Sequence, residues 1–168
     1  MDIVLFGALC RPGLERQTAY ELLALAVREV FSLDTLPEIA REEGGKPFFP
    51  GAPRICFNLS HSHGAAVCAL HDRPIGVDVE KLRPAPRRLA AGMPDDAFFR
   101  RWTAREATVK LQGRSWQALL SDWEPDSRCR WEEALLPGWI IAVCPTEESP
   151  IRVKRIGTEE LDSVGGQA

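Results

Sequence analysis

Apolar residues recur at three- and four-residue intervals between Pro12 and about Phe31, which predicts an amphipathic helix. The recurring positions are Tyr20, Leu22, Leu23, Ala26, Val27 and Val30. The apolar run before it, from Ile3 to Cys10, is short and follows the acidic Asp2, so it suits a first strand rather than a secretory leader. The chain is therefore expected to begin with a strand and then a helix.

The next segments alternate between apolar and polar residues, as strands with one buried face do. Residues 55–59 follow this pattern after a glycine-rich turn at 43–47, so 38–59 is predicted to form a hairpin-like run of strands. The apolar run 64–70 and the alternating run 75–80 flank a short turn. We expect these two strands to pair antiparallel with each other.

Two helices are expected after these strands. Asp95 or Asp96 caps the first helix, and Thr103 begins the second, which ends near Gly113. The strands expected after the helices are 128–135 and 139–144, joined as a hairpin through Pro137 and Gly138, and a last strand at 151–156.

Helix and strands, followed by helix and strands again, form a coarse repetition with its break near 71–74. This order predicts an α+β fold of two similar halves packed together. We expect an N-terminal half over 1–72, a C-terminal half over 73–160 and a frayed tail over 161–168. A chain of 168 residues buries roughly 70% of its unfolded surface, enough for one core or two half-domains.

Composition and charge exclude several classes of protein. With 45% apolar and 27% charged residues, the chain is typical of soluble globular proteins rather than disordered or membrane proteins. Its net charge of −3 argues against non-specific binding to nucleic acid or to an anionic membrane. Residues 81–114 nevertheless carry nine basic and three acidic side chains, which suits either a solvated helical face or a surface for phosphates or an acidic protein.

The cysteines favour a reducing compartment. They are odd in number, contain no Cys-x-x-Cys pair and stand at Cys10, Cys56, Cys68, Cys129 and Cys144. This spacing predicts neither a disulfide framework nor a zinc site, but small buried thiols in the cytoplasm.

Three carboxylates are candidate metal ligands. Asp78 and Glu80 lie two positions apart on an expected strand, so they face the same side, and such close like charges need a cation such as Mg²⁺. Taken alone, the pair is explained more simply as an exposed acidic strand end. Glu106 offers a third carboxylate and Lys110 a cation one turn later, but a Thr103-x-x-Glu106 capping box with an i,i+4 ion pair explains them without a metal.

Small polar groups and imidazoles gather in residues 58–63, where a strand is expected to end. The two histidines of this segment lack a further ligand at transition-metal spacing. A phosphate contact by Ser60 and His61 is more economical, and Lys46 on the preceding turn would add a compact positive charge for the same anion.

Four segments, in this order, resemble the 4′-phosphopantetheinyl transferases of the Sfp type. They are 45–48 (GKPF), 57–62 (FNLSHS), 75–80 (IGVDVE) and 102–110 (WTAREATVK). The resemblance is firm over about 44–112. It implies a pseudo-dimer of two similar α+β halves with the active site in the cleft between them.

The resemblance also implies the reaction of a holo-[acyl-carrier-protein] synthase. Such an enzyme transfers the 4′-phosphopantetheine arm of coenzyme A to a serine of an apo acyl, peptidyl or aryl carrier protein, and it releases adenosine 3′,5′-bisphosphate. Neither nucleic acid nor a membrane is an expected partner, and we expect a cytoplasmic monomer. Two other classes stay open, a non-catalytic relative that binds coenzyme A or a carrier protein, and a Mg²⁺-dependent phosphohydrolase.

By this resemblance, Asp78, Glu80 and Glu106 would hold Mg²⁺ against the pyrophosphate of coenzyme A. Lys110 would neutralise the same phosphates. Glu106 is the candidate base for the serine proton, which gives a catalytic set of Glu106, Lys110 and Asp78.

The remaining expected contacts concern the nucleotide and the carrier. Lys46, Ser60 and His61 match positions that hold the adenosine 3′-phosphate end of coenzyme A. The arginines of the basic stretch, Arg100 and Arg101 among them, would steer an acidic helix of the carrier.

Overall fold

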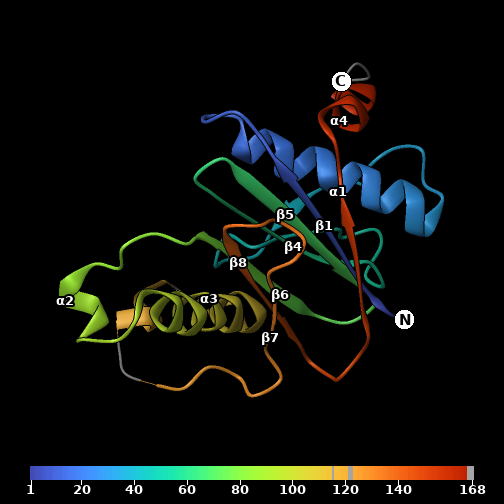
Figure 1. The fold of residues 1–168 in the computed structure, drawn as a ribbon. Coiled ribbons are helices and arrows are strands. Elements are labelled where there is room, and N and C mark those ends of the chain that lie inside the picture. Colours follow the sequence, from blue (N-terminus) through green and yellow to red (C-terminus); the bar gives the residue numbers. More distant parts are fainter. Residues whose placement is uncertain (115, 121–122, 166–168) are drawn as a thin grey trace.

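The computed structural model describes residues 1–114, 116–120 and 123–165, and it confirms an α+β fold (Figure 1). The helices are α1 (Glu15–Phe31), α2 (Arg87–Ala90), α3 (Asp95–Gln112) and α4 (Thr158–Gly165), with a 3-10 helix at Trp116–Leu120. The strands are β1 (Ile3–Leu9), β2 (Ala40–Arg41), β3 (Pro47–Phe48), β4 (Cys56–Ser62), β5 (Ala65–His71), β6 (Ile75–Lys81), β7 (Arg130–Glu132), β8 (Trp139–Pro145) and β9 (Ile151–Arg155). None of the helices in these ranges is long and apolar enough to cross a membrane.

The larger sheet has the strand order β4-β5-β1-β9 and carries α1 on one face (Figure 1). Its strands pair antiparallel except β1 and β9, which are parallel. Helix α1 buries Leu22 and Leu23 against Phe6 and Phe57 of the sheet. This confirms the predicted amphipathic helix, which begins at Glu15 rather than at Pro12.

The smaller sheet has the order β6-β8-β7, and α3 crosses it. Helix and sheet approach closely at Gly76, where a Cβ atom would lie 2.0 Å from the carbonyl oxygen of Ala107 and 2.7 Å from the amide of Leu111. Only a residue without a side chain allows this contact. Gly76 therefore lets α3, which carries Glu106, lie directly on the strand that carries Asp78.

The two sheets meet where β4 lies beside β6. Side chains of β4 bridge the strands, since the backbone amide of Val77 donates to Asn58 Oδ1 at 2.8 Å and that of Val79 to Ser60 Oγ at 3.3 Å. The expected pairing of 64–70 with 75–80 is wrong, because β5 already has β4 and β1 as neighbours and β6 pairs with β8. The alternating pattern gave the faces of these strands but not their partners.

Helix α3 is continuous where two helices were expected. The Thr103 hydroxyl donates to the carbonyls of Phe99 at 2.8 Å and Arg100 at 3.1 Å, within the helix. A threonine satisfied by the preceding turn does not cap a new helix. The capping box that would have explained Glu106 is therefore not formed.

The C-terminal segment returns to the larger sheet. The predicted hairpin is confirmed as β7 and β8, and the predicted last strand as β9, which adds to β1. Helix α4 then packs against α1. It extends to Gly165, so residues 161–165 are helical where a frayed tail was expected. Residues 166–168 lie outside the described part of the chain.

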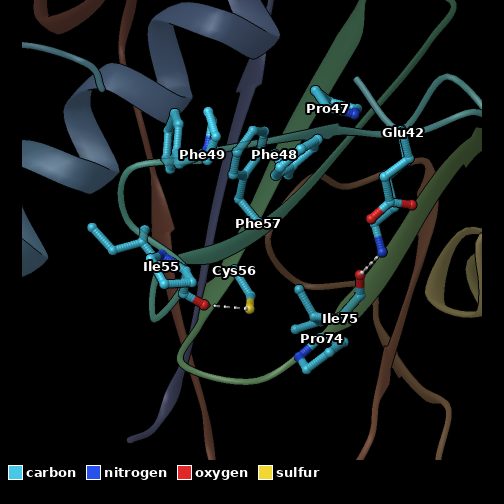
Figure 2. A pocket seen from close by; sticks show the side chains of 12 residues that line it. Glu42, Pro47, Phe48, Phe49, Ile55, Cys56, Phe57, Pro74 and Ile75 are labelled. Carbon is cyan, nitrogen blue, oxygen red and sulfur yellow. Dashed lines mark hydrogen bonds between the residues drawn. The ribbon is translucent and has the colours of Figure 1, made fainter. Parts of the chain in front are cut away.

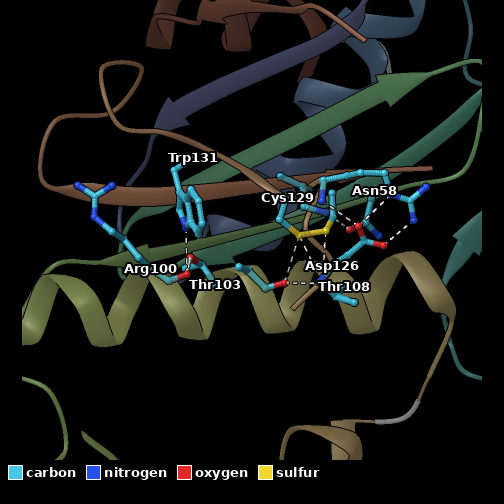
Figure 3. The surroundings of a disulfide bond; sticks show 11 residues. Asn58, Arg100, Thr103, Thr108, Asp126, Cys129 and Trp131 are labelled. Carbon is cyan, nitrogen blue, oxygen red and sulfur yellow. Dashed lines mark hydrogen bonds and ion pairs between the residues drawn. A yellow bond between two sulfur atoms is a disulfide. The ribbon is translucent and has the colours of Figure 1, made fainter. Parts of the chain in front are cut away.

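A disulfide joins Cys129 to Cys144, so the expectation that these two cysteines are free thiols is wrong (Figure 3). The hairpin register pairs Arg130 with Val143, which puts the cysteines opposite each other one position further on. The register of the hairpin, rather than cysteine spacing, was the sequence signal for this bond. Cys10, Cys56 and Cys68 are free.

Candidate active site

Three carboxylates converge at the junction of the sheets. Asp78 and Glu80 project from β6 and Glu106 from α3, and each offers an oxygen within 4.8 Å of the other two. Asp78 is only 2% exposed, and with Glu106 ionised its Oδ2 is buried without a hydrogen-bond partner in the described part of the chain. A buried carboxylate oxygen that lacks a partner is costly unless a cation compensates it.

Burial and the negative charge of Asp78 raise the pKa of Glu106 to about 8, although Lys110 opposes the rise. A carboxyl group with this pKa holds a proton at neutral pH when no further cation is near. A cation bound beside it would lower this pKa and leave Glu106 ionised.

Lys110 lies one turn after Glu106 on α3 and reaches across to β6. Its ammonium donates to Asp78 Oδ1 at 2.7 Å, to Ser60 Oγ at 2.9 Å and to the carbonyl of Val77 at 3.1 Å. The Ser60 hydroxyl also donates to Asp78 Oδ1 at 2.8 Å. Ser60 is thus part of the carboxylate cluster.

Two residues that the sequence did not single out hold Glu80. Ser62 donates to Glu80 Oε2 at 3.0 Å and Arg83 donates to the same oxygen at 2.9 Å. Arg83 also donates to the carbonyl of Lys81, and its guanidinium lies 4.7 Å from the centre of the Phe99 ring. The signal for Ser62 was its position two residues after Ser60, which puts both on one face of β4.

Lys46 lies apart from this cluster, beside a cavity of about 220 Å³ with largely apolar walls (Figure 2). Its ammonium donates to the carbonyl of Ile75 at 3.2 Å, and burial lowers the pKa of Lys46. Phe48, Cys56 and Pro74 are among the residues that line this cavity. Glu42 also lines the cavity, so its wall carries one carboxylate beside the ammonium of Lys46.

His61 lies on an open groove of about 400 Å³ on the other side of Pro47, which lines both hollows. Arg16 and Arg41 make this groove basic. Arg41 is held in place because it donates to the Tyr20 hydroxyl at 3.0 Å and to the carbonyl of Gly45 at 2.8 Å. The structure thus brings together Asp78, Glu80, Glu106, Lys110 and Ser60, and it places Lys46 and His61 in two neighbouring hollows.

The donor set fits a hard divalent cation. Three carboxylates with one buried unpaired oxygen among them match the ligands of Mg²⁺, which is held by a few carboxylates together with waters and phosphates. The described chain places no cysteine or histidine in this cluster, which disfavours zinc.

Curated relatives connect this arrangement to known proteins. The chain is 32% identical to the 4′-phosphopantetheinyl transferase AcpT of Escherichia coli O157:H7, in an alignment that covers 83% of this chain and 82% of AcpT. It belongs to the 4′-phosphopantetheinyl transferase family. This transferase is also 27% identical to Sfp of Bacillus subtilis (strain 168), in an alignment that covers 90% of this chain and 86% of Sfp.

A further 4′-phosphopantetheinyl transferase of Bacillus subtilis is 32% identical to this chain. That alignment covers 55% of this chain and 49% of the relative. No family model matches the sequence. The membership of the transferase in this family, which is a family of enzymes, therefore rests on whole-chain similarity to curated relatives.

Proposed function

We propose that this transferase moves the 4′-phosphopantetheine arm of coenzyme A to a serine hydroxyl of an apo carrier protein. In this step the serine oxygen forms a bond to the β-phosphorus of coenzyme A. The bond from that phosphorus to the bridging oxygen breaks, and adenosine 3′,5′-bisphosphate leaves with the bridging oxygen. The observation that supports this proposal most directly is the cluster of three carboxylates and Lys110 at the sheet junction.

Asp78, Glu80 and Glu106 are the proposed ligands of Mg²⁺. When bound there, the ion would neutralise charge on the pyrophosphate of coenzyme A. The unpaired Oδ2 of Asp78 supports this assignment from the chain itself, because it leaves one oxygen for a cation while Lys110 occupies the other.

The proton of the attacking serine goes to Glu106 in this proposal. A cation bound to the cluster would lower the pKa of Glu106 and leave it ionised, so that its carboxylate could accept the proton. The ammonium of Lys110 would neutralise charge on the phosphate oxygens, and because Asp78, Ser60 and Val77 already accept its three hydrogen bonds, it would have to exchange one of them to donate to phosphate. Asp78 and Ser60 hold that ammonium at the edge of the cluster, so the charge is in place before substrate binds.

The nucleotide end of coenzyme A is proposed to lie along the two hollows beside Pro47. Lys46 and His61, with Arg16 and Arg41, would contact the 3′-phosphate, and the apolar cavity would take the adenine. Ser60, the third expected contact of this phosphate, already serves Asp78 and Lys110. We therefore assign its hydroxyl to the support of the cluster.

The carrier is proposed to dock on residues 82–94, which connect β6 to α3 through α2. This segment carries three arginines and no acidic residue. Arg87 and Arg88 are exposed and have no carboxylate at ion-pair distance within the described ranges. The next residue, Leu89, is 59% exposed. Exposed arginines beside an exposed leucine suit an acidic surface with an apolar side chain.

Arg100 and Arg101, which the sequence offered for this role, have acidic partners within the chain. Arg100 donates to Glu133 at 3.1 Å and Arg101 to Glu124 at 2.9 Å. Their charge is largely compensated, which favours Arg87 and Arg88 as the steering pair.

Reversal of Arg87 and Arg88 to glutamate should therefore raise the KM for the carrier and leave the KM for coenzyme A unchanged. The matched control reverses Arg28 and Arg155, which are exposed on α1 and β9 and lie outside this segment. An unchanged KM for the carrier in the Arg87→Glu, Arg88→Glu variant would remove this surface from the proposal.

The whole-chain proposal is a monomeric pseudo-dimer in the cytoplasm, although the Cys129–Cys144 bond removes the support that free thiols gave to this compartment. Helix α1 with β4, β5 and β1, and helix α3 with β6, β8 and β7, support two halves that divide near residue 72. The C-terminal half then lends β9 and α4 to the sheet and helix of the first half.

Intact mass spectrometry tests the proposed reaction. An apo carrier protein incubated with coenzyme A, Mg²⁺ and this transferase should gain the mass of one phosphopantetheine arm. Release of adenosine 3′,5′-bisphosphate without a change in carrier mass would indicate a phosphohydrolase instead. No reaction, with binding of coenzyme A retained, would indicate a non-catalytic relative.

A further inference from the structure

The hydroxyl groups of β4 and the carboxylates of β6 lie in register. Ser60 donates to Asp78 at 2.8 Å, and Ser62, two residues further, donates to Glu80 at 3.0 Å. Both pairs are separated by the same eighteen positions in the chain. A Ser-x-Ser segment of one sheet thus supports the Asp-x-Glu segment of the other.

We propose that Ser62 is a positioning residue that fixes the carboxylate of Glu80 for metal binding. This inference rests on the proposed function, because that proposal gives Glu80 its role as a ligand. A glutamate side chain has three rotatable bonds, and a carboxylate ligand that is not held by an outer hydrogen bond loses affinity for its metal. Ser62 supplies such a bond from a separate sheet.

The position of Ser62 is itself fixed. Its backbone carbonyl accepts from Trp139 Nε1 at 3.3 Å, which ties the end of β4 to β8. Its hydroxyl lies 2.7 Å from His63 Nδ1. Because a hydroxyl has a single proton, donation to Glu80 leaves its lone pairs to accept from an Nδ1–H of His63.

Arg83 binds the same oxygen of Glu80 from the other side. Both hydrogen bonds end on Oε2, and within the described ranges no hydrogen bond ends on Oε1. The carboxylate is thus anchored through one oxygen, while the other is available to a ligand. Arg83 also carries a positive charge that would repel a metal ion, so its substitution would change both the hydrogen bond and the charge. Ser62 is neutral, so its substitution tests the hydrogen bond alone.

Calorimetric titration of MgCl₂ or MnCl₂ into the protein without coenzyme A tests this proposal. Ser62→Ala should raise the Kd of the metal about tenfold, as loss of an outer hydrogen bond to a ligand does. Ser62→Thr keeps the hydroxyl and should restore most of the affinity. Ser127→Ala is the matched control, because Ser127 is exposed and makes no side-chain hydrogen bond within the described chain.

A second readout does not depend on equal stability of the variants. The rise in Tm that saturating Mg²⁺ produces should be smaller in Ser62→Ala than in the wild type, each against its own metal-free value. In turnover, the KM for Mg²⁺ should rise while kcat at saturating Mg²⁺ changes little.

Unchanged metal affinity in Ser62→Ala, or no rescue by Ser62→Thr, would overturn the inference. The metal titration needs no transfer reaction, so it reports on Ser62 even if the wild type transfers nothing. Conversely, normal transfer by a wild type whose metal affinity does not depend on Ser62 would leave the proposed function standing and remove only the positioning role.

Discussion

At the scale of single residues, the site is built from groups that would repel one another without a cation. Asp78, Glu80 and Glu106 approach closely, and among the residues that the structure describes, Lys110 and Arg83 form ion pairs with them. Burial and Asp78 raise the pKa of Glu106 to about 8, which favours a proton on its carboxyl group at neutral pH when no metal is bound. Proton and metal therefore compete for the same cluster.

This competition predicts how stability depends on pH in the absence of metal. The pKa of Glu106 is about 8 in the folded chain against 4.5 as its ordinary value, so the folded state binds the proton more tightly. Its contribution to stability is complete below about pH 4.5 and is lost as pH rises toward 8. The free energy of unfolding in urea should therefore fall between about pH 5 and pH 8, within the interval between the ordinary and the folded pKa of Glu106.

The same urea unfolding measurements on the Glu106→Gln variant isolate the contribution of Glu106, because the glutamine side chain does not titrate. The difference in unfolding free energy between wild type and variant should shift by more than about 1.4 kcal/mol over this range, the equivalent of one pKa unit. Parallel pH profiles for the two proteins would contradict the raised pKa. Glu148→Gln, at an exposed position without side-chain contacts in the described chain, is the control for charge.

At the scale of elements, the site depends on how closely α3 approaches β6. Gly76 makes that approach possible, and α3 runs unbroken through Thr103 so that Glu106 and Lys110 both face the strand. The sequence predicted the acidic strand and a helical segment around Glu106. It could not predict the pairing of β6 with β8, because an alternating pattern defines the faces of a strand and leaves its neighbours open.

Gly76→Ala should disrupt this contact, since the new Cβ would lie 2.0 Å from the Ala107 carbonyl oxygen. Overpacking of this kind costs about 1–3 kcal/mol, and the displaced helix should also weaken metal binding. Gly51→Ala is the control, because a Cβ there meets no atom within 4 Å. Equal stability of the two variants in urea unfolding would refute the role assigned to Gly76.

At the scale of the whole molecule, long-range pairings complete a fold whose parts the sequence largely predicted. The first helix, the hairpin near the C-terminus and the last strand were predictable from periodicity and turn residues. The return of β9 to β1 and the Cys129–Cys144 bond were not, because both depend on register between distant or facing strands. The four motifs located the candidate site, but only the folded chain separates Lys46 and His61 from the carboxylates.

The disulfide should contribute to stability, because it closes a loop of 15 residues. Chain entropy assigns a loop of this size about 3 kcal/mol. Addition of a dithiol reductant should lower the urea midpoint of the wild type, whereas a Cys129→Ala, Cys144→Ala variant should not respond. Alkylation of the denatured, unreduced protein should label three cysteines, and labelling of all five would show that the bond is absent.

The central claim is that the carboxylate cluster carries out the transfer, and the transfer rate of Glu106→Gln tests it most directly. The substitution preserves size and removes the carboxylate that a bound cation would need as a ligand, and no capping box depends on it. The account predicts a protein that melts near the wild type but transfers phosphopantetheine about 10²-fold more slowly or worse, because it lacks a base and a metal ligand. Near-normal transfer by a well-folded Glu106→Gln protein, measured beside Glu148→Gln, would contradict the account.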